Sequence, residues 1–500
     1  MENGANSFHL RLRSELENYI MAQYFGKSPI LRDSVGSRLD EEGVLYQKPY
    51  IESSPAYQTV PNGISQTNIP DWLKDFFSSL SDAGLGVYPA PFVHQITALE
   101  RAYHGDDLFV STGTGSGKTE CFMWPLLSKL IVEAHDSANT WANRGIRSII
   151  MYPMNALVSD QVSRLRRLIG DTDNQFVKIF RSICGQDARR PQFGMYTGRT
   201  PYPGINPTPT EDHRLEKTLK RMAFPQTDEE KEFFEKLVNE GKVPAKTDMN
   251  AFLNRLHDGY HIPNEEDAEL ITRFEMQQFC PDILITNYSM LEYMLLRPRE
   301  AKIWEETKRW LHSDPANKLL FIIDEAHMYR GSSGGEVALL IRRVFHKLGI
   351  SRDRVQFILT TASMPDASPD DRQKVLTFAR ELTSSAEDAE FCYLRGERES
   401  IDGLGTYSIP VEKFSDCDPN RIENNDSRLA ALNEFWSDVE GCAAPFSDLS
   451  SAYEWMYDNL LQYEPFQTLI LNCRGTAVSL QELSSLIFPQ EENEAALNSV

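Results

Sequence analysis

The sequence predicts an α/β protein whose core is a parallel sheet. Apolar runs of strand length alternate with helical patterns, and the runs at Leu319–Ile323 and Val355–Thr361 are continuous, as in strands that are buried on both faces. Each of these runs ends in a cluster of polar residues. Strands that alternate with helices form parallel sheets, and such sheets bind their ligands along the carboxyl ends of the strands.

Further elements extend this alternation over much of the chain. Strands are also predicted at 108–110, 146–152 and 193–197, and in the first half of 281–291. Apolar residues at helical spacing occur near the N-terminus, between the strands and again in the last part of the chain. The helices predicted with the clearest spacing cover residues 7–25, 71–80, 96–103, 428–436, 450–463 and 492–500.

The character of the sequence changes along the chain and divides it into three parts. Residues 1–80 are predicted to form an N-terminal arm, which is helical at first and rich in loops and proline over 26–70. Residues 81–365 carry the alternating strands and helices, interrupted by a charged helical insertion at 202–270. Residues 366–500 lose the alternation and are predicted to form a mostly helical accessory region.

The composition is that of a soluble globular protein, with 41% hydrophobic and 25% charged residues. The formal net charge of −22 argues against nucleic-acid binding through bulk charge, but it allows a local basic groove. The seven cysteines include no Cys-x-x-Cys pair, so no zinc site or disulfide framework is indicated and a reducing cytoplasm is the expected compartment. We expect no membrane association, because no apolar run approaches the roughly 18 residues that cross a bilayer and the N-terminus does not read as a secretory signal.

A glycine-rich stretch from Ser111 to Glu120 follows one predicted strand and precedes a helix. A phosphate-binding loop has this arrangement: a strand is followed by a glycine-rich loop, a Lys-Thr pair and a helix. Backbone N–H groups of the loop and the helix N-terminus hold phosphate oxygens. We expect Lys118 to reach the β- and γ-phosphates and the Thr119 hydroxyl to bind Mg²⁺. The strict pattern has a glycine where this chain has Thr112. The predicted nucleotide contacts in the loop are Thr114, Gly115, Ser116, Gly117, Lys118 and Thr119.

Two carboxylates follow the strand at Leu319–Ile323, in the sequence Asp-Glu-Ala-His. Beside a phosphate-binding loop, Asp324 would hold Mg²⁺ and Glu325 would orient the water that attacks the γ-phosphate. The alternative is an ordinary acidic loop, since the chain has 73 acidic residues. The order of loop, buried strand and Asp-Glu favours the catalytic interpretation.

A glutamine precedes the phosphate-binding loop. Gln95 lies 23 residues before Lys118 (118 − 95), and a glutamine amide can donate to one adenine nitrogen while it accepts from another. An aromatic residue such as Phe92 or Tyr88 could stack on the base. A glutamine on the surface before a helix is also common, so this feature has weight only together with the loop.

Taken in order, these segments resemble the motifs of superfamily 2 helicases of the DEAD/DEAH-box type. They look like the adenine-reading glutamine and motifs I, Ia, Ib, II and III. The resemblance implies a RecA-like motor lobe of the P-loop NTPase class, which binds ATP and Mg²⁺ and acts on nucleic acid, with His327 and Asp324, Glu325 and Lys118 in the catalytic site. The segments that carry it are Gln95, 111–119, 153–161, 286–291, 324–327 and 361–363.

Two longer passages indicate a narrower group. Residues 281–298 and 324–335 are similar to large bacterial helicases of anti-phage defence loci, such as the helicase subunits of Druantia and DISARM, and to MrfA-type repair helicases. The Druantia type is preferred. This resemblance implies a DNA-acting motor in a defence system, with a further protein of that system as a possible partner.

The same resemblance places a set of side chains in a nucleic-acid groove, where contacts to phosphates position the strand without reading its sequence. For Arg164, a solvated helix face is an equally good interpretation. Thr361 and Ser363 would couple the two sites through His327. The predicted groove residues are Pro153, Asn155, Gln161, Arg164, Thr286 and Asn287.

The chain departs from the family pattern in more than the loop. The third motif reads Thr-Ala-Ser instead of Ser-Ala-Thr, and Lys118 and Asp324 lie 206 residues apart (324 − 118), about twice the usual gap. No second motor lobe is found, and no segment supplies an arginine finger, which can raise the rate by ~10³–10⁵. We therefore expect these residues to be part of a longer protein and to hydrolyse ATP weakly alone.

Two other functions remain compatible with the sequence. The chain could be an ATP-binding clamp or scaffold that does not unwind processively, which the acidic composition and single lobe would suit. It could also remodel RNA, because the same motifs bind either backbone and recognition of the 2′-hydroxyl is not visible in a sequence.

Overall fold

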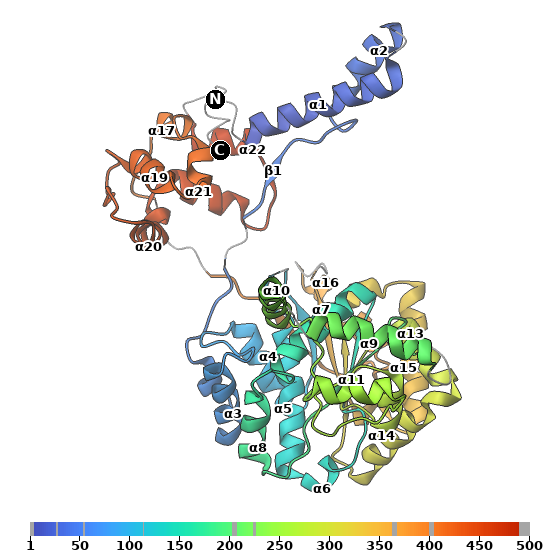
Figure 1. Ribbon diagram of the computed structural model, residues 1–500. Coiled ribbons are helices and arrows are strands. Elements are labelled where there is room, and N and C mark those ends of the chain that lie inside the picture. The colour runs from blue at the N-terminus through green and yellow to red at the C-terminus, as the bar shows by residue number, and fades with distance from the viewer. Residues whose placement is uncertain are drawn as a thin grey trace. The chain divides into compact units, whose positions relative to one another are not determined.

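The computed structural model of the chain forms two compact units. One consists of residues 57–397, and the other joins residues 1–56 to residues 398–500 (Figure 1). The structure describes residues 5–26, 29–53, 56–113, 115–202, 208–223, 227–362, 368–399 and 405–489.

The larger unit is built on an eight-stranded sheet in which all paired strands are parallel. The strand order is β5-β4-β6-β3-β7-β8-β2-β9. This arrangement confirms the predicted α/β class and the RecA-like parallel sheet. The strands are β2 (Asp107–Ser111), β3 (Ser148–Tyr152), β4 (Phe193–Tyr196), β5 (Glu269–Leu270), β6 (Ile283–Asn287), β7 (Leu319–Ile323), β8 (Val355–Thr361) and β9 (Phe391–Arg395).

Helices cover both faces of this sheet (Figure 1). Side chains of β7 point alternately to the two faces: Leu320 and Ile322 join one apolar cluster, and Phe321 joins the other. The first cluster includes α3 (Asp71–Asp82), α4 (Val93–Tyr103), α5 (Glu120–Asp136), α7 (Asn155–Leu168) and α8 (Gln175–Cys184). The second includes α12 (Arg273–Gln278), α13 (Tyr288–Leu296), α14 (Ala301–Ser313), α15 (Ser332–Leu348) and α16 (Pro369–Leu382).

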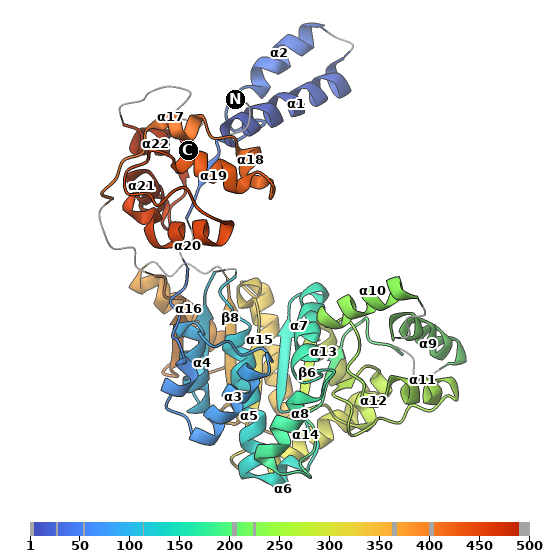
Figure 2. The same cartoon turned by 60° about the vertical axis from the view of Figure 1, so that its left-hand side comes forward.

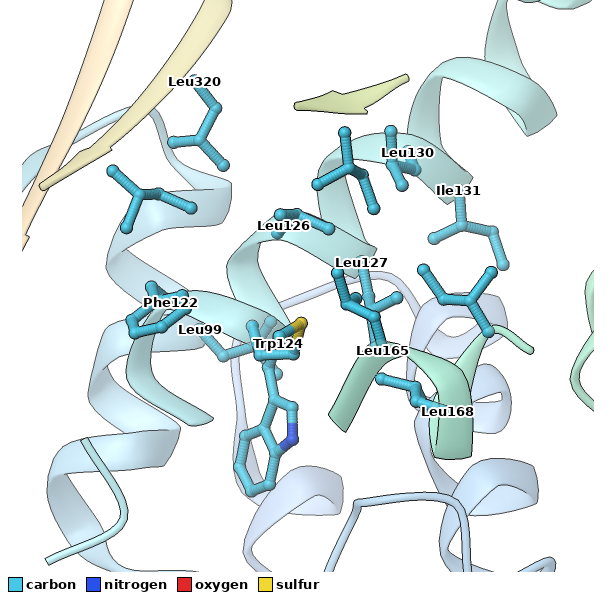
Figure 3. Packing of buried hydrophobic residues seen from close by; sticks show 14 of the residues in the cluster. Leu99, Phe122, Trp124, Leu126, Leu127, Leu130, Ile131, Leu165, Leu168 and Leu320 are labelled. Carbon is cyan, nitrogen blue, oxygen red and sulfur yellow. The ribbon is translucent and has the colours of Figure 1, made fainter. Parts of the chain in front are cut away.

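Helix α5, which follows the glycine-rich loop, is apolar on nearly all sides because it lies between the sheet and other helices. Figure 3 shows Phe122, Trp124 and Leu127 of this helix in the same cluster as Leu165 and Leu168 of α7. The indole N–H of Trp124 donates to the carbonyl of Gly86 at 3.1 Å. The loop is thus fixed to a helix that cannot shift without disturbing the core.

Buried charge pairs join the strands at the amino-terminal edge of the sheet, opposite the edge that carries the glycine-rich loop. Arg147 is fully buried and pairs with Glu133 at 2.9 Å and with Asp282 at 3.3 Å. Arg189 also binds Asp282, at 2.7 Å. The pKa of the Asp282 carboxyl lies below its ordinary value, because the two arginines outweigh the effect of burial, which alone would raise it.

The predicted insertion is helical (Figure 2), and it has an apolar cluster of its own. Its elements are α9 (Pro209–Ala223), α10 (Asp228–Asn239) and α11 (Met249–His257), and β5 follows them at the edge of the sheet. Arg166 of α7 binds Glu269 with two hydrogen bonds of 2.7 Å. Lys246 is buried between Asp267, at 3.1 Å, and Glu275. Buried charge pairs therefore join the insertion to the sheet.

The smaller unit is mostly helical. Its apolar cluster includes Trp436, Phe446 and Tyr463, and β1 (Tyr50–Ile51) pairs with β10 (Val478–Ser479) in a short antiparallel ribbon. No helix in the described part of the chain is long and apolar enough to cross a membrane. The helices of this unit are α1 (Ala5–Phe25), α2 (Pro29–Leu39), α17 (Val411–Ser415), α18 (Pro419–Glu423), α19 (Arg428–Trp436), α20 (Leu449–Asn459), α21 (Glu464–Cys473) and α22 (Leu480–Ile487).

The structural units do not follow the boundaries predicted from the sequence. Helix α3 belongs to the larger unit because its apolar face packs in the core of the sheet, so the arm ends before residue 57 and not at residue 80. Strand β9 belongs to the sheet although it lies beyond residue 365. The segment 26–70 contains α2, whose first residue is Pro29, a position at which proline suits a helix. The helix predicted at 492–500 lies outside the described residues.

Candidate functional site

The glycine-rich loop connects β2 to α5 at the carboxyl edge of the sheet. Gly115 and Gly117 have φ values of +74° and +66°, a region that glycine enters without the strain of a side chain. Thr112, the residue that departs from the family pattern, is buried and accepts a hydrogen bond from the Ser116 hydroxyl at 2.7 Å. Its side chain therefore braces the loop from inside. Thr114 lies outside the described residues.

Lys118 and the Asp-Glu pair meet at this edge. The Lys118 ammonium lies 3.6 Å from the Glu325 carboxylate. Asp324 is 8% exposed and accepts hydrogen bonds from the Thr360 hydroxyl and, at 3.0 Å, from the backbone N–H of Glu325. Burial raises the pKa of Asp324 and the charge of Glu325 adds to the rise, against the hydrogen bond from Thr360. The structure thus brings Lys118 to the Asp-Glu pair, although Lys118 and Asp324 lie 206 residues apart in sequence (324 − 118).

Glu325 adopts a strained backbone conformation with a φ of +51°, which costs a residue with a side chain about 1–3 kcal/mol. One oxygen of its carboxylate is buried without a hydrogen-bond partner in the described residues and lies 3.2 Å from the His327 ring. The same ring nitrogen of His327 lies 3.1 Å from the Thr361 hydroxyl. His327 therefore finds a hydroxyl partner in the third motif despite its altered order. Ser363 lies outside the described residues.

The predicted adenine-reading residues lie against the loop. Gln95 is 2% exposed; its amide oxygen accepts from the Phe92 N–H at 2.9 Å, and its amide nitrogen donates to the Gly117 carbonyl at 3.2 Å. A contact between Gln95 and a base stays a prediction, and the observed role of this side chain is to link α4 to the loop. The alternative aromatic residue, Tyr88, is 54% exposed.

Two further residues hold the loop, and neither was predicted from the sequence. A ring nitrogen of His94 lies 2.7 Å from the Ser116 carbonyl, and its ring stacks on Phe92 with a centroid distance of 5.5 Å. The Tyr57 hydroxyl accepts a hydrogen bond from the Gly113 N–H at 3.1 Å. His94 adjoins Gln95 and could have been suspected, but Tyr57 lies 56 residues before the loop, in a segment with no motif.

The predicted groove residues divide into two groups. The Asn287 amide donates to the Asn155 side chain at 2.6 Å, which joins the end of β6 to the start of α7, and Pro153 lies two residues before Asn155 in the chain. Thr286 is fully buried and its hydroxyl donates to the Tyr196 carbonyl at 2.7 Å, so its side chain does not reach the surface.

The other two predicted groove side chains belong to α7. Gln161 is 6% exposed, and its amide oxygen has no hydrogen-bond partner within the described residues. Arg164 pairs with Glu120 at 2.9 Å and with Asp160 at 3.5 Å. It is therefore more than a solvated side chain, and it could contact a phosphate only by giving up these ion pairs. The asparagines are therefore the better placed of the predicted contacts.

The residues at the loop fit a nucleoside triphosphate with a divalent cation. A Cβ added at Gly115 would meet nothing within 4 Å, so the loop borders open space. The Lys118 ammonium lies 3.6 Å from the Glu325 carboxylate, a distance longer than a hydrogen bond. The described residues contain no group of three or more His, Cys, Asp or Glu side chains that could hold a metal. A cation here would take Thr119 and Asp324 as protein ligands and complete its shell with phosphate oxygens and water, which is the manner in which Mg²⁺ commonly binds.

Comparison with known proteins identifies the domain that contains this site. Residues 92–243, which include Gln95, the glycine-rich loop and Asn155, match the family "DEAD/DEAH box helicase". The chain carries a DEAD/DEAH box helicase domain. The acidic segment 324–327 follows the matched range within the same sheet, at the end of β7.

Relatives of this helicase domain support a narrower resemblance. The chain is 38% identical over 527 residues to Druantia protein DruE of Escherichia coli (strain UMEA 4076-1), and the alignment covers 97% of the chain and 27% of DruE. This relative confirms the predicted resemblance to the Druantia helicase. The chain is also 20% identical over 273 residues to the uncharacterized ATP-dependent helicase MJ1574 of Methanocaldococcus jannaschii, covering 55% of the chain and 26% of that protein.

Some solved helicase structures are similar to this chain at a lower sequence identity. The DUF1998 helicase MrfA bound to DNA and AMPPNP is 16% identical, with a TM-score of 0.37, and the comparison covers 81% of this chain and 42% of that chain. The chain spans about a quarter of the length of its DruE relative.

Proposed function

We propose that the chain is the ATP-binding part of a nucleic-acid motor, that it acts on DNA, and that it works in anti-phage defence together with further proteins of a defence system. The observation that carries this proposal is the division of one sheet edge into two halves. The loop and the Asp-Glu pair lie at the ends of β2, β7 and β8, and the asparagine pair lies at the neighbouring ends of β3 and β6.

Each side chain of the first half has a role in hydrolysis. Backbone N–H groups of the loop and the N-terminus of α5 bind phosphate oxygens. Lys118 offsets charge on the γ-phosphate. Thr119 and Asp324 would hold Mg²⁺, and the bound ion would supply further neutralisation of the phosphate charge. Glu325, one of whose carboxylate oxygens accepts no hydrogen bond within the described residues, orients and polarises the attacking water.

The two halves are joined through β7 and β3. The backbone N–H of Asp324 donates to the Met151 carbonyl at 3.1 Å, one residue before the end of β3. The predicted coupling residue Thr361 contacts His327 in the first half. A change at the γ-phosphate can therefore reach the strand that leads to Asn155 over a short path of packed backbone.

The test is the ATPase rate of the chain with and without single-stranded DNA. We expect DNA to raise the rate several-fold, from a low basal value. Glu325→Gln should lower the stimulated rate by at least about 100-fold, the lower range for loss of a general base, while nucleotide binding remains. Glu305→Gln, at an exposed position of α14, is the matched control and should leave the rate unchanged.

Other outcomes would favour the alternative functions. An ATPase that is indifferent to every nucleic acid would contradict the motor proposal and favour an ATP-binding clamp. Stimulation by RNA and not by DNA would replace the proposed substrate by RNA while leaving the mechanism in place.

A further inference from the structure

Arginines gather at the carboxyl end of β4, beside the predicted groove. Arg273 is 2% exposed and donates to the Thr197 carbonyl at 2.9 Å, while its Nε has no hydrogen-bond partner within the described residues. Burial lowers the pKa of Arg273, and the neighbouring charges of Arg297 and Arg299 lower it further, against the effect of Tyr196. The guanidinium of Arg273 thus lies near the charges of Arg297 and Arg299.

Few carboxylates compensate this charge. Glu300 is fully buried, accepts a hydrogen bond from the Tyr196 hydroxyl at 2.6 Å and lies 4.0 Å from Arg299. Arg199 is exposed in the turn that Arg273 holds, and neither Arg199 nor Arg297 pairs with a carboxylate in the described part of the chain. A local excess of positive charge on a chain of net charge −22 indicates an anionic partner.

An exposed aromatic side chain lies next to these arginines. Tyr293 of α13 is 50% exposed, and the guanidinium of Arg297 lies 4.8 Å from the centre of its ring. Leu296, beside them on the same helix, is 62% exposed. Aromatic rings and arginine planes are the surfaces on which unpaired bases stack, and this stacking tolerates any base sequence.

The arginines and Tyr293 are continuous with the asparagine pair. Tyr196 at the end of β4 is in register with Thr286 of β6, and α13 begins directly after Asn287. Asn287 in turn binds Asn155. Helix α13 therefore leads from the asparagine pair, at its N-cap, to Tyr293 near its end and to Arg297, which follows its last residue.

We propose that Arg199, Tyr293 and Arg297 form a contact surface for single-stranded nucleic acid, called here the Tyr293 surface. Arg199 and Arg297 bind backbone phosphates, and Tyr293 stacks on a base. Arg273 is a positioning residue, which holds the turn that carries Arg199. This inference rests on the proposed function and extends its groove beyond the residues that the helicase motifs supply.

The test is the affinity of the whole chain for a fluorescent oligothymidylate, measured by anisotropy over a range of salt concentrations with a non-hydrolysable ATP analogue present. Tyr293→Ala should weaken binding by about 5- to 100-fold, as expected for one stacked base, and leave the salt dependence unchanged. Arg297→Ala should weaken binding and reduce the slope of log affinity against log salt by about 0.7. The matched controls, Tyr260→Ala and Arg309→Ala at exposed positions elsewhere in the same unit, should bind as the wild type does.

The outcomes separate this inference from the proposed function. If the wild type binds the oligonucleotide and both variants bind equally well, the Tyr293 surface is wrong and the motor proposal stands. If the wild type neither binds nucleic acid nor has its ATPase stimulated by it, both are wrong. All the substituted side chains are exposed or half-buried, so circular dichroism should show folded variants throughout.

Discussion

Replacing Gly117 by alanine tests how the loop and Gln95 depend on each other. The added Cβ would lie 2.2 Å from the Gln95 amide nitrogen, in a residue whose φ is +66°. A side chain in this backbone region lowers the free energy of unfolding by about 1–2 kcal/mol. Alanine also makes the unfolded chain less flexible than glycine does, which offsets roughly 0.4–1 kcal/mol of this loss. Gln95 is buried and cannot move aside without losing two hydrogen bonds, each of which contributes about 1 kcal/mol.

The total expected loss for Gly117→Ala is therefore about 3 kcal/mol in the free energy of unfolding, summed from these terms. Gly115→Ala is the matched control, because its φ is +74° but its Cβ would meet nothing within 4 Å. It should lose only about 1 kcal/mol. Urea unfolding followed by tryptophan fluorescence, without nucleotide, measures both, since Trp124 lies in the same core.

A double variant isolates the clash. In a Gln95→Ala background, Gly117→Ala should cost no more than Gly115→Ala does, because the amide that it would strike is gone. Equal losses for the two glycine variants in the wild-type background would refute the coupling between the loop and Gln95.

Two further predictions concern groups that the structure buries. Arg147→Met should lower the free energy of unfolding by roughly 3–5 kcal/mol, as for other buried pairs that lose one partner, because Glu133 and Asp282 would remain charged and buried; a loss below 1 kcal/mol in urea unfolding would contradict it. Burial lowers the pKa of His94 in the folded chain from the ordinary value of 6.5. As the pH falls, the unfolded chain therefore binds a proton at this histidine before the folded chain does. The free energy of unfolding should accordingly be highest above pH 6.5 and fall as the pH drops below 6.5. Urea titrations between pH 8 and 5 should show this loss in the wild type and a smaller one in His94→Gln, and equal pH dependence would show that His94 does not titrate in this way.

The strands with the strongest apolar character were predictable from sequence. Leu319–Ile323 and Val355–Thr361 are β7 and β8 with the predicted bounds, because a strand buried on both faces leaves a continuous apolar run. Strand β5 has two residues, too few for any period, and β9 mixes buried and exposed positions at the sheet edge, so neither left a readable pattern.

The candidate site was predictable where one segment carries its own chemistry. Lys118, Asp324 and Glu325 belong to short motifs whose spacing reflects a strand followed by a turn. Tyr57 acts through a single hydroxyl at a distance of 56 residues, and the pairing of Asn155 with Asn287 depends on the order of strands in the sheet. Such contacts arise from tertiary packing, which local patterns do not encode.

We propose that ATP and nucleic acid bind to adjacent halves of one sheet edge and influence each other. The most direct measurement is the affinity of the chain for single-stranded DNA with and without a non-hydrolysable ATP analogue. We expect the analogue to change this affinity by at least about 5-fold, the lower range of such couplings, and Lys118→Ala to abolish the change. An affinity that is the same with and without the analogue, at a concentration that saturates nucleotide binding, would contradict the account.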